Sequence, residues 1–240
     1  MFYKEICRPR PSDYTRNGKL SFEAILQMLE SVASSHSESA GDSIADANKN
    51  GISWILTEWR VKIIRRPENG ENLHITTWVR GKVPSSTIYR DYILTDANGA
   101  EVIRAEARIA LFDLHTKSLI RVDEKRFLAY QPEEKVLFDN ASRLRSAVAY
   151  DYEAEIRLRN SDMDFNGHLH NTRYITLALE GLENAYGNNL DFTEFRIAYL
   201  RPVQDSNAVR IKSVANETGY LIEICADSTS CSLVEMKNNS

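Results

Sequence analysis

Apolar residues recur along this sequence with two different periods, and each period predicts a different kind of element. Two stretches have helical spacing, with apolar side chains three and four residues apart. The first predicts a helix that follows an N-cap at Ser21 and runs to about residue 40, with the apolar face Phe22, Ile25, Leu26, Leu29, Val32 and Ala33. The second predicts a helix over Gly167–Tyr186, with the apolar face Tyr174, Ile175, Ala178, Leu179, Leu182, Ala185 and Tyr186.

Shorter runs rich in β-branched and aromatic residues, separated by turn residues, predict strands. Before the second helix these are a short strand or arm at 3–14, then Trp54–Ile64, Leu73–Arg80, Ser86–Thr95, Glu101–Asp113 and Tyr152–Arg159. After it they are Phe192–Leu200, Ala208–Asn216, Tyr220–Ala226 and Ser232–Lys237. The predicted turns include Asn17-Gly18, Pro67–Gly70, Lys82–Pro84 and Asp96–Gly99. Polar residues 34–50 predict a loose connection, and residues 114–130 are expected to leave the sheet.

The order strand, helix, strands occurs twice, and the two occurrences share short matches. Asn17-Gly18-Lys19-Leu20 matches Asn166-Gly167-His168-Leu169 at an offset of 149 residues. Trp59–Arg65 matches Phe195–Arg201 at an offset of 136, and Tyr89 and Ile93 match Tyr220 and Ile224 at an offset of 131. Because the matches keep their order, we predict a duplicated α+β unit. The expected division is an N-terminal unit at 1–130, a linker at 131–146 and a C-terminal unit at 147–240.

Composition narrows the class of protein. The chain has 240 residues, 42% of them hydrophobic, and a formal net charge of -4. The mildly acidic balance argues against nucleic acid as the main partner. Three cysteines without a CxxC pair indicate a reducing compartment rather than a disulfide framework. No stretch is long enough to span a bilayer, and the first residues do not read as a signal peptide, so we expect a soluble cytoplasmic protein.

The candidate chemistry lies just before the second predicted helix. Asp164, Asn166 and His168 alternate there, with Gly167 between the last two. A carboxylate and an imidazole can exchange protons, and the amides at a helix N-terminus suit an oxygen that gains negative charge. The alternative interpretation is that Asp164 and Asn166 only cap the helix and that Gly167 only serves a turn. In the first copy the matching residues are Thr15 and Lys19, so we expect one active site per chain.

No cofactor or metal site is predicted. His168 and His170 are two residues apart on the predicted helix and would therefore point to nearly opposite faces, so a shared ion is not expected. No nucleotide-binding loop, metal-ligand cluster or redox motif is evident in the sequence.

In these residues the sequence resembles the acyl-acyl carrier protein thioesterases of the plant and bacterial type. The match is Asp-x-Asn-x-His at Asp164, Asn166 and His168, followed by Asn171 and Tyr174. Further similar stretches, in the same order, are Gly51–Leu56, Arg66-Pro67, Thr77-Trp78, Tyr89-Arg90-Asp91 and Asp96-x-x-Gly99. The resemblance implies an α+β double hot-dog fold, in which a sheet wraps each of two long helices. One departure is Pro202-Val203, which stands where plant members carry a Glu-Cys pair.

The resemblance also implies an activity, the hydrolysis of fatty acyl-acyl carrier protein thioesters in fatty acid biosynthesis. Asp164 would be general base or nucleophile, His168 would polarise or protonate, and Asn166 would orient water or the carbonyl. The backbone amides of Gly167 and His168 would form the oxyanion site, and Asn171 would brace the loop. Candidates for contact with the acyl chain, each of which could equally be plain core, are Ile25, Leu26, Leu29, Trp54 and Tyr174.

The expected partner is an acyl carrier protein with a phosphopantetheine-linked acyl chain, and a homodimer is an open expectation. Because carrier proteins are acidic, two basic groups are candidate docking residues, although solvated surface charge is the competing interpretation: Arg60, Lys62, Arg65 and Arg66, and Arg121, Lys125 and Arg126. Alternative functions are an acyl-coenzyme A thioesterase, a hot-dog dehydratase, or a non-catalytic acyl-binding protein.

Overall fold

The computed structural model describes residues 1–81, 85–187, 190–204 and 206–238. It divides into two compact units, Met1–Asn140 and Ala141–Ser240. The division falls inside the segment 131–146 that the sequence marks as a linker. The predicted turn at Lys82–Pro84 lies outside the described residues.

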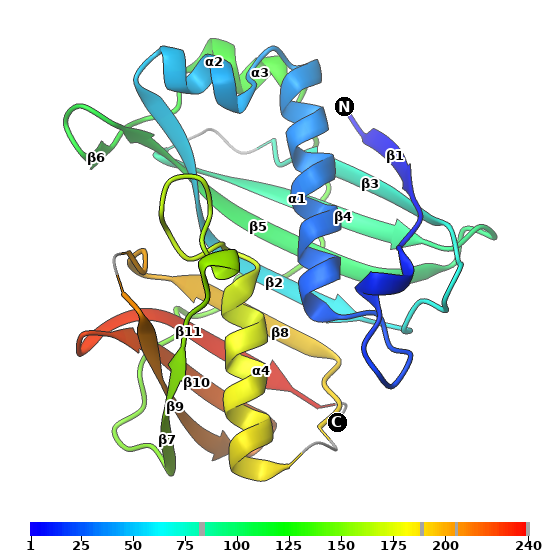
Figure 1. The fold of residues 1–240 in the computed structure, drawn as a ribbon. Coiled ribbons are helices and arrows are strands. Elements are labelled where there is room, and N and C mark those ends of the chain that lie inside the picture. The colour runs from blue at the N-terminus through cyan, green and yellow to red at the C-terminus, as the bar shows by residue number, and fades with distance from the viewer. Residues whose placement is uncertain (82–84, 188–189, 205, 239–240) are drawn as a thin grey trace. The chain divides into compact units, whose positions relative to one another are not determined.

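Unit 1 consists of a long helix, α1, and an antiparallel sheet, with short helices beside them (Figure 1). The strand order is β1-β3-β4-β5-β2, and β6 pairs with β5. The elements are β1 (Tyr3–Cys7), the 3-10 helix η1 (Pro11–Asp13), α1 (Phe22–Ser39), α2 (Ile44–Lys49), β2 (Ile52–Ile63), β3 (Leu73–Val79), β4 (Thr87–Thr95), β5 (Glu101–Asp113), β6 (Ser118–Leu119) and α3 (Glu124–Ala129).

Helix α1 begins where the sequence predicts. The Ser21 hydroxyl accepts a hydrogen bond from the backbone N–H of Ala24 at 3.1 Å, which satisfies one donor of the first turn. One face of the helix, which includes Ile25, Leu26 and Leu29, is fully buried. Burial of such side chains is worth about 1.5–3 kcal/mol each, so the apolar face holds the helix against the sheet.

Unit 2 repeats this arrangement with shorter connections. Its strand order is β7-β9-β10-β11-β8, with helix α4 packed on the sheet (Figure 1). The elements are β7 (Tyr152–Arg157), η2 (Asn160–Asp162), α4 (Arg173–Tyr186), β8 (Glu194–Tyr199), β9 (Ala208–Asn216), β10 (Gly219–Ala226) and β11 (Thr229–Lys237). Each strand of unit 2 thus has a counterpart at the same sheet position in unit 1, and the predicted duplication is confirmed.

Strand register corrects one of the predicted matches. Ile75 of β3 pairs with Leu94 of β4, and the equivalent Ile211 of β9 pairs with Ile224 of β10. Ile224 therefore corresponds to Leu94, at an offset of 130, and not to Ile93. A slip of one residue in a strand exchanges its two faces, and the burial agrees, because Leu94 and Ile224 are both fully buried.

Several predicted strand ends differ from the structure by a few residues, and three other predicted segments differ more substantially. Helix α4 begins at Arg173 rather than Gly167, because Met163 forms a β-bridge with Leu169 and holds the intervening residues in a loop. The polar stretch 34–50 is not a loose connection, since α1 continues to Ser39 and α2 follows an N-cap at Ser43. The segment 114–130 does not wholly leave the sheet, since β6 pairs with β5 before α3 begins after its N-cap Asp123. In the described part of the chain, no helix combines the length and the apolar character needed to cross a bilayer.

Candidate active site

Asp164–His168 form a tight loop that precedes helix α4. The backbone N–H of Asp164 donates to the carbonyl of His168 at 2.7 Å, and the N–H of Gly167 donates to the carbonyl of Asp164 at 3.0 Å. Gly167 has a φ of 76°, in the left-handed region where glycine is favoured. The loop therefore holds Asp164, Asn166 and His168 close together by backbone bonds, without a contribution from the first turn of a helix.

The carboxylate of Asp164 is bound to this same loop. Its Oδ1 accepts hydrogen bonds from the backbone N–H groups of Asn166 at 2.8 Å and of His168 at 3.0 Å. Two such bonds fix the orientation of the carboxylate. Asp164 and His168 are both half-buried, so a ligand could reach either side chain.

The predicted oxyanion donors have a different role in this structure. The N–H groups of Gly167 and His168 both donate within the loop, to the carbonyl oxygen and to Oδ1 of Asp164. The argument from a helix N-terminus is wrong, because α4 begins only at Arg173.

The segment at Pro202-Val203 supports the loop through its backbone. The N–H of Leu169 donates to the carbonyl of Val203 at 2.9 Å, and His168 forms a β-bridge with Gln204. The N–H of Val203 donates to the hydroxyl of Tyr174 at 3.1 Å. Val203 is fully buried, so its role here is to connect the loop to helix α4 rather than to supply a reactive group.

Tyr174 lies behind the loop at the start of α4. Its side chain is buried, and its ring meets that of Tyr199 edge to face at 5.3 Å. Burial raises the pKa of Tyr174 to about 12, with smaller contributions from Cys231 and Asp164, so the phenol stays neutral. The contribution of Asp164 shows that its carboxylate acts electrostatically on this phenol. The Tyr199 hydroxyl donates to the carbonyl of Asn171 at 2.9 Å, and the expected role of Asn171 as a brace for the loop stays a prediction.

His170 is a residue whose role the sequence did not indicate. Its Nδ1 accepts hydrogen bonds from the N–H of Thr172 at 3.4 Å and from the Thr172 hydroxyl at 3.1 Å. It stands 149 residues after Ser21, the N-cap of α1, and serves the same end of the equivalent helix. His170 lies before α4, not on the helix, and its ring bonds to Thr172, which occupies the N-cap position.

The equivalent loop of unit 1 has the same backbone and different side chains. The N–H of Thr15 donates to the carbonyl of Lys19 at 2.8 Å, and the N–H of Gly18 donates to the carbonyl of Thr15 at 2.9 Å. Gly18 has a φ of 71°, and Tyr14 forms a β-bridge with Leu20. Thr15 and Lys19 occupy the positions of Asp164 and His168, so only the loop in unit 2 carries an acid and an imidazole.

The residues expected near an acyl chain are mostly ordinary core in this structure. Ile25, Leu26 and Leu29 are fully buried on α1. Trp54 is half-buried, donates from Nε1 to Asp42 at 2.8 Å, and packs against a cluster that includes residues of α2 and α3. Their contact with a ligand stays a prediction.

The two later cysteines are buried, and burial raises the pKa of both thiols. Cys225 is 3% exposed and Cys231 is 2% exposed. The Cys231 thiol donates to the carbonyl of Thr229 at 3.4 Å. Both side chains are therefore thiols rather than thiolates near neutral pH, which suits packing more than nucleophilic attack.

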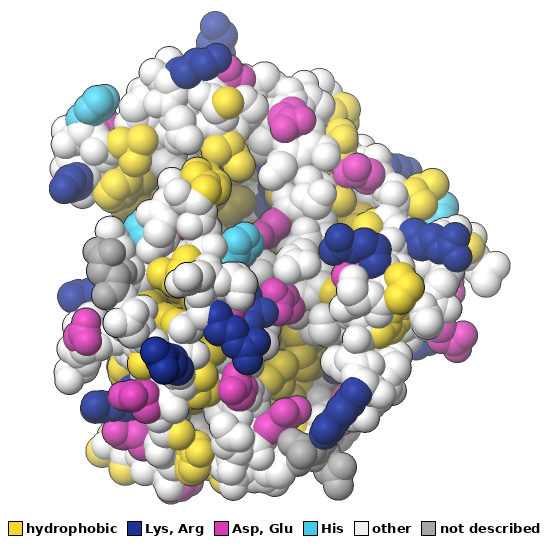
Figure 2. All heavy atoms as spheres, in the orientation of Figure 1, with side chains coloured by type: hydrophobic (Ala, Val, Ile, Leu, Met, Phe, Trp, Pro, Cys, Tyr) yellow, Lys and Arg dark blue, Asp and Glu magenta, His cyan; other side chains and the backbone are white. Residues whose placement is uncertain are grey.

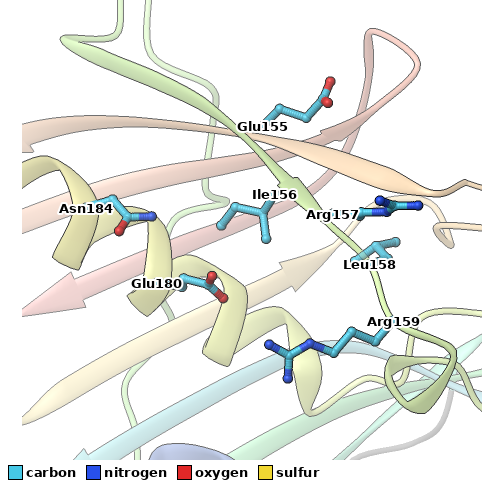
Figure 3. A pocket seen from close by; sticks show the side chains of 7 residues that line it. All are labelled: Glu155, Ile156, Arg157, Leu158, Arg159, Glu180 and Asn184. Atoms are coloured by element: carbon cyan, nitrogen blue, oxygen red, sulfur yellow. The ribbon is translucent and has the colours of Figure 1, made fainter.

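An open hollow of about 420 Å³ lies between the end of β7 and helix α4 (Figure 3). Arg159 extends across it toward Glu180 of α4, and Glu155 and Arg157 line its rim. Its lining is mainly charged and does not include Asp164 or His168, so it does not suit an acyl chain.

Comparison with known proteins assigns the chain to a family. The acyl-ACP thioesterase N-terminal domain model matches residues 3–130, and the C-terminal domain model matches residues 145–236. The chain is 27% identical over 225 residues to oleoyl-acyl carrier protein thioesterase 2, chloroplastic, of Arabidopsis thaliana. The alignment covers 86% of this chain and 61% of that protein. It thus spans about three fifths of the length of this curated relative.

Solved structures agree on the fold. The 12:0-ACP thioesterase from Umbellularia californica superimposes with a TM-score of 0.86 at 15% identity, covering 98% of this chain and 96% of the other. An acyl-ACP thioesterase from Bacteroides thetaiotaomicron gives a TM-score of 0.85 at 19% identity, covering 98% and 97%. The predicted α+β double hot-dog fold is confirmed. Because the two domain models together match most of its length, this chain belongs to the acyl-ACP thioesterase family.

Proposed function

We propose that this protein hydrolyses fatty acyl thioesters of acyl carrier protein and releases free fatty acid. The observation that supports the proposal is the loop Asp164–His168, in which the backbone N–H groups of Asn166 and His168 orient the carboxylate of Asp164. The same loop in unit 1 has neither group, so the chemistry is confined to one of two copies of one scaffold. Family membership and the names of the relatives support the same activity.

In the first route Asp164 acts as general base. It takes a proton from water, the resulting hydroxide attacks the thioester carbonyl, and the carbon–sulfur bond breaks. Thiols have a pKa near ~8.5, so the departing thiolate is a good leaving group and takes its proton from the protonated Asp164 or from His168. Asn166 and His168 would hold the carbonyl oxygen while it carries negative charge.

In the second route Asp164 is the nucleophile. Its carboxylate attacks the thioester carbonyl, the thiolate leaves, and water then cleaves the acyl anhydride to free fatty acid and restored Asp164. Mass spectrometry of the protein, quenched during turnover of a slow substrate, separates the routes. An acyl adduct on Asp164 selects the second route, and complete absence of an adduct during the turnover burst selects the first.

The proposal predicts that Asp164→Asn and His168→Ala each reduce kcat/KM for acyl-acyl carrier protein by at least about 100-fold. Asn keeps an acceptor at the Oδ1 position, so the loop should survive while the charge is lost. The matched controls are Thr15→Ala and Lys19→Ala in the equivalent loop of unit 1, which should leave turnover near that of the parent. The measurement is release of free fatty acid, with circular dichroism to verify folding.

Near-normal turnover of both folded unit 2 variants would contradict the assignment of the site. Hydrolysis of acyl-coenzyme A with a higher kcat/KM than acyl-acyl carrier protein would instead identify coenzyme A as the carrier. A purified protein that binds acyl chains and releases no fatty acid would be a non-catalytic acyl-binding protein.

Two further expectations belong to this proposal. A cytoplasmic location is supported by the cysteines Cys7, Cys225 and Cys231, which are all free, whereas the plant relatives carry the description chloroplastic. Association into a homodimer is open to measurement by light scattering of the purified protein.

A further inference from the structure

Unit 1 buries a group of polar side chains between α1 and its sheet. We call Glu30 of α1, Trp59 of β2, and Arg90 and Tyr92 of β4 the polar centre. Trp59, Arg90 and Tyr92 are each only 1% exposed. Arginine is almost never buried to this degree without a specific reason.

Strand register brings these side chains together. Trp59 and Arg90 both pair with Ala107 of β5, from its two sides, and Tyr92 pairs with Ala105. All of them therefore share the face that α1 covers. The rings of Trp59 and Tyr92 are 5.5 Å apart. The pKa of Tyr92 is raised chiefly by burial, is lowered by Arg90 and is raised by Glu30, so both charged groups act on this phenol.

Each of three members of the polar centre has a buried polar atom without a hydrogen-bond partner among the described residues. These atoms are Nε1 of Trp59, Nε of Arg90 and Oε1 of Glu30. Arg90 is anchored at its other end, where Nη1 lies 2.6 Å from Nδ1 of His36. An unpaired buried polar group costs about 1–3 kcal/mol, so two donors and one acceptor together are a large cost for a folded domain to carry.

The second unit shows that the fold does not require this arrangement. At the equivalent positions it has Leu179, Phe195, Tyr220 and Ile222 in place of Glu30, Trp59, Arg90 and Tyr92. The small residues Ala105 and Ala107 are replaced by Val234 and Met236, which are fully buried. Unit 2 thus has three apolar side chains and the half-buried Tyr220 in this layer, whereas unit 1 combines polar groups with small ones.

We propose that the polar centre binds an oxygen atom carried by the acyl chain of the substrate, in a hydroxyl or keto group. The N–H groups of Trp59 and Arg90 donate to that oxygen, and the Glu30 carboxyl accepts from a hydroxyl. The inference rests on the proposed function and names its substrate class. Leu26 lies one helical turn before Glu30 on α1, so the unsubstituted part of the chain would contact apolar residues such as this one.

The side chain of Glu30 suits this role. Burial raises the pKa of Glu30 to about 7, so near neutral pH its carboxyl is present in both forms. The protonated form can donate to a keto oxygen and the charged form can accept from a hydroxyl. A methylene group can do neither, and it would leave all three polar atoms unpaired.

The first test is binding, which does not depend on catalysis. Isothermal titration calorimetry compares straight-chain fatty acids with hydroxy acids of the same length, with the hydroxyl moved stepwise along the chain. We expect one hydroxyl position to bind about tenfold more tightly than the plain acid. Equal affinity at every position overturns the proposal, as does a crystal structure of the hydroxy-acid complex in which only water contacts the polar centre.

The second test uses kcat/KM on the two kinds of acyl-acyl carrier protein. Trp59→Phe removes one donor and keeps a ring, so it should lower the ratio of kcat/KM for the hydroxyacyl over the plain substrate about tenfold. The matched control is Trp78→Phe, because Nε1 of Trp78 donates elsewhere, to the carbonyl of Lys135 at 2.8 Å. The control should leave the ratio unchanged, and an equal ratio in Trp59→Phe and the parent overturns the proposal.

The two tests separate this inference from the proposed function. Selective binding of a hydroxy acid without hydrolysis of any thioester supports the polar centre and rejects the hydrolase. Hydrolysis of plain acyl-acyl carrier protein without any preference for oxygenated chains supports the hydrolase and rejects the polar centre.

Discussion

At the level of single residues, Asp164 has two tasks, since it is both a structural acceptor within its loop and the proposed reactive group. Sequence spacing was enough to identify it with Asn166 and His168, because the three lie within one local loop. The same reasoning missed the hydrogen bond between His170 and Thr172, because residue spacing does not show the direction in which a side chain turns. It also missed the polar centre, because Glu30 of α1 and Arg90 of β4 are far apart in the sequence and both act on Tyr92 only when the helix packs on the sheet.

Glu30 predicts a specific pH dependence of stability. Its folded-state pKa of about 7 exceeds the ordinary value of 4.5, so between about pH 4.5 and 7 the folded protein retains a proton that the unfolded chain has released. The contribution of Glu30 to the free energy of unfolding should therefore fall by roughly 3 kcal/mol as pH rises through this window, while His36, whose pKa is lowered by burial, contributes a change of opposite sign up to about pH 6.5. Glu30→Gln should remove that fall, which urea denaturation of both proteins at a series of pH values measures.

The control for this prediction is Glu38→Gln, which changes an exposed carboxylate on the same helix and should keep the dependence of the parent. Parallel curves for the parent and Glu30→Gln across the window would show that Glu30 does not hold its proton in the folded protein.

At the level of elements, long periodic segments were predictable and short or irregular ones were not. The bounds of β5 and β9 agree with the prediction because their apolar and polar residues alternate up to turn residues. Helices α2 and α3 were missed because each is too short for a periodic pattern, although each has a side-chain N-cap. The start of α4 was placed too early because Leu169, which is buried through a β-bridge, continues the apolar spacing.

The contact between α4 and the segment at Val203 predicts a linked loss of stability and activity. Tyr174→Phe removes the hydroxyl that accepts from the N–H of Val203, and that buried donor then lacks its partner. We expect a destabilisation of about 1–3 kcal/mol and a reduced kcat, because Val203 also holds Leu169 beside the Asp164–His168 loop. Chemical denaturation and turnover assays measure the two effects. An unchanged kcat in the destabilised variant would show that this contact supports the fold alone.

At the level of the whole molecule, surface charge limits how an acidic carrier protein can dock. On the face in Figure 2, basic and acidic side chains are interspersed. Several predicted docking residues already serve the protein itself, since Arg65 contacts Glu71 at 2.6 Å and Arg126 contacts Asp42 at 3.2 Å. Sequence alone could not separate these arginines from the exposed Arg121 and Lys125, because ion pairing depends on distant residues.

We therefore expect Lys125→Glu to raise KM for acyl-acyl carrier protein several-fold at low salt, with little change in kcat, because charge reversal opposes encounter with an acidic partner. The effect should shrink as ionic strength rises. Lys4→Glu, an equal change of charge on β1, is the control. An identical rise in KM for both variants at every salt concentration would indicate a general charge effect rather than a docking residue.

The paired loops of the two units have a consequence for protein engineering. The backbone around Thr15 makes the same turn as the backbone around Asp164, so a carboxylate at position 15 would be placed on the same loop geometry. Thr15→Asp combined with Lys19→His would place a carboxylate and an imidazole at the equivalent positions of the unit 1 loop. The duplication thus provides a second loop of the same backbone shape in unit 1, where new reactive residues can be introduced without changing the loop of unit 2.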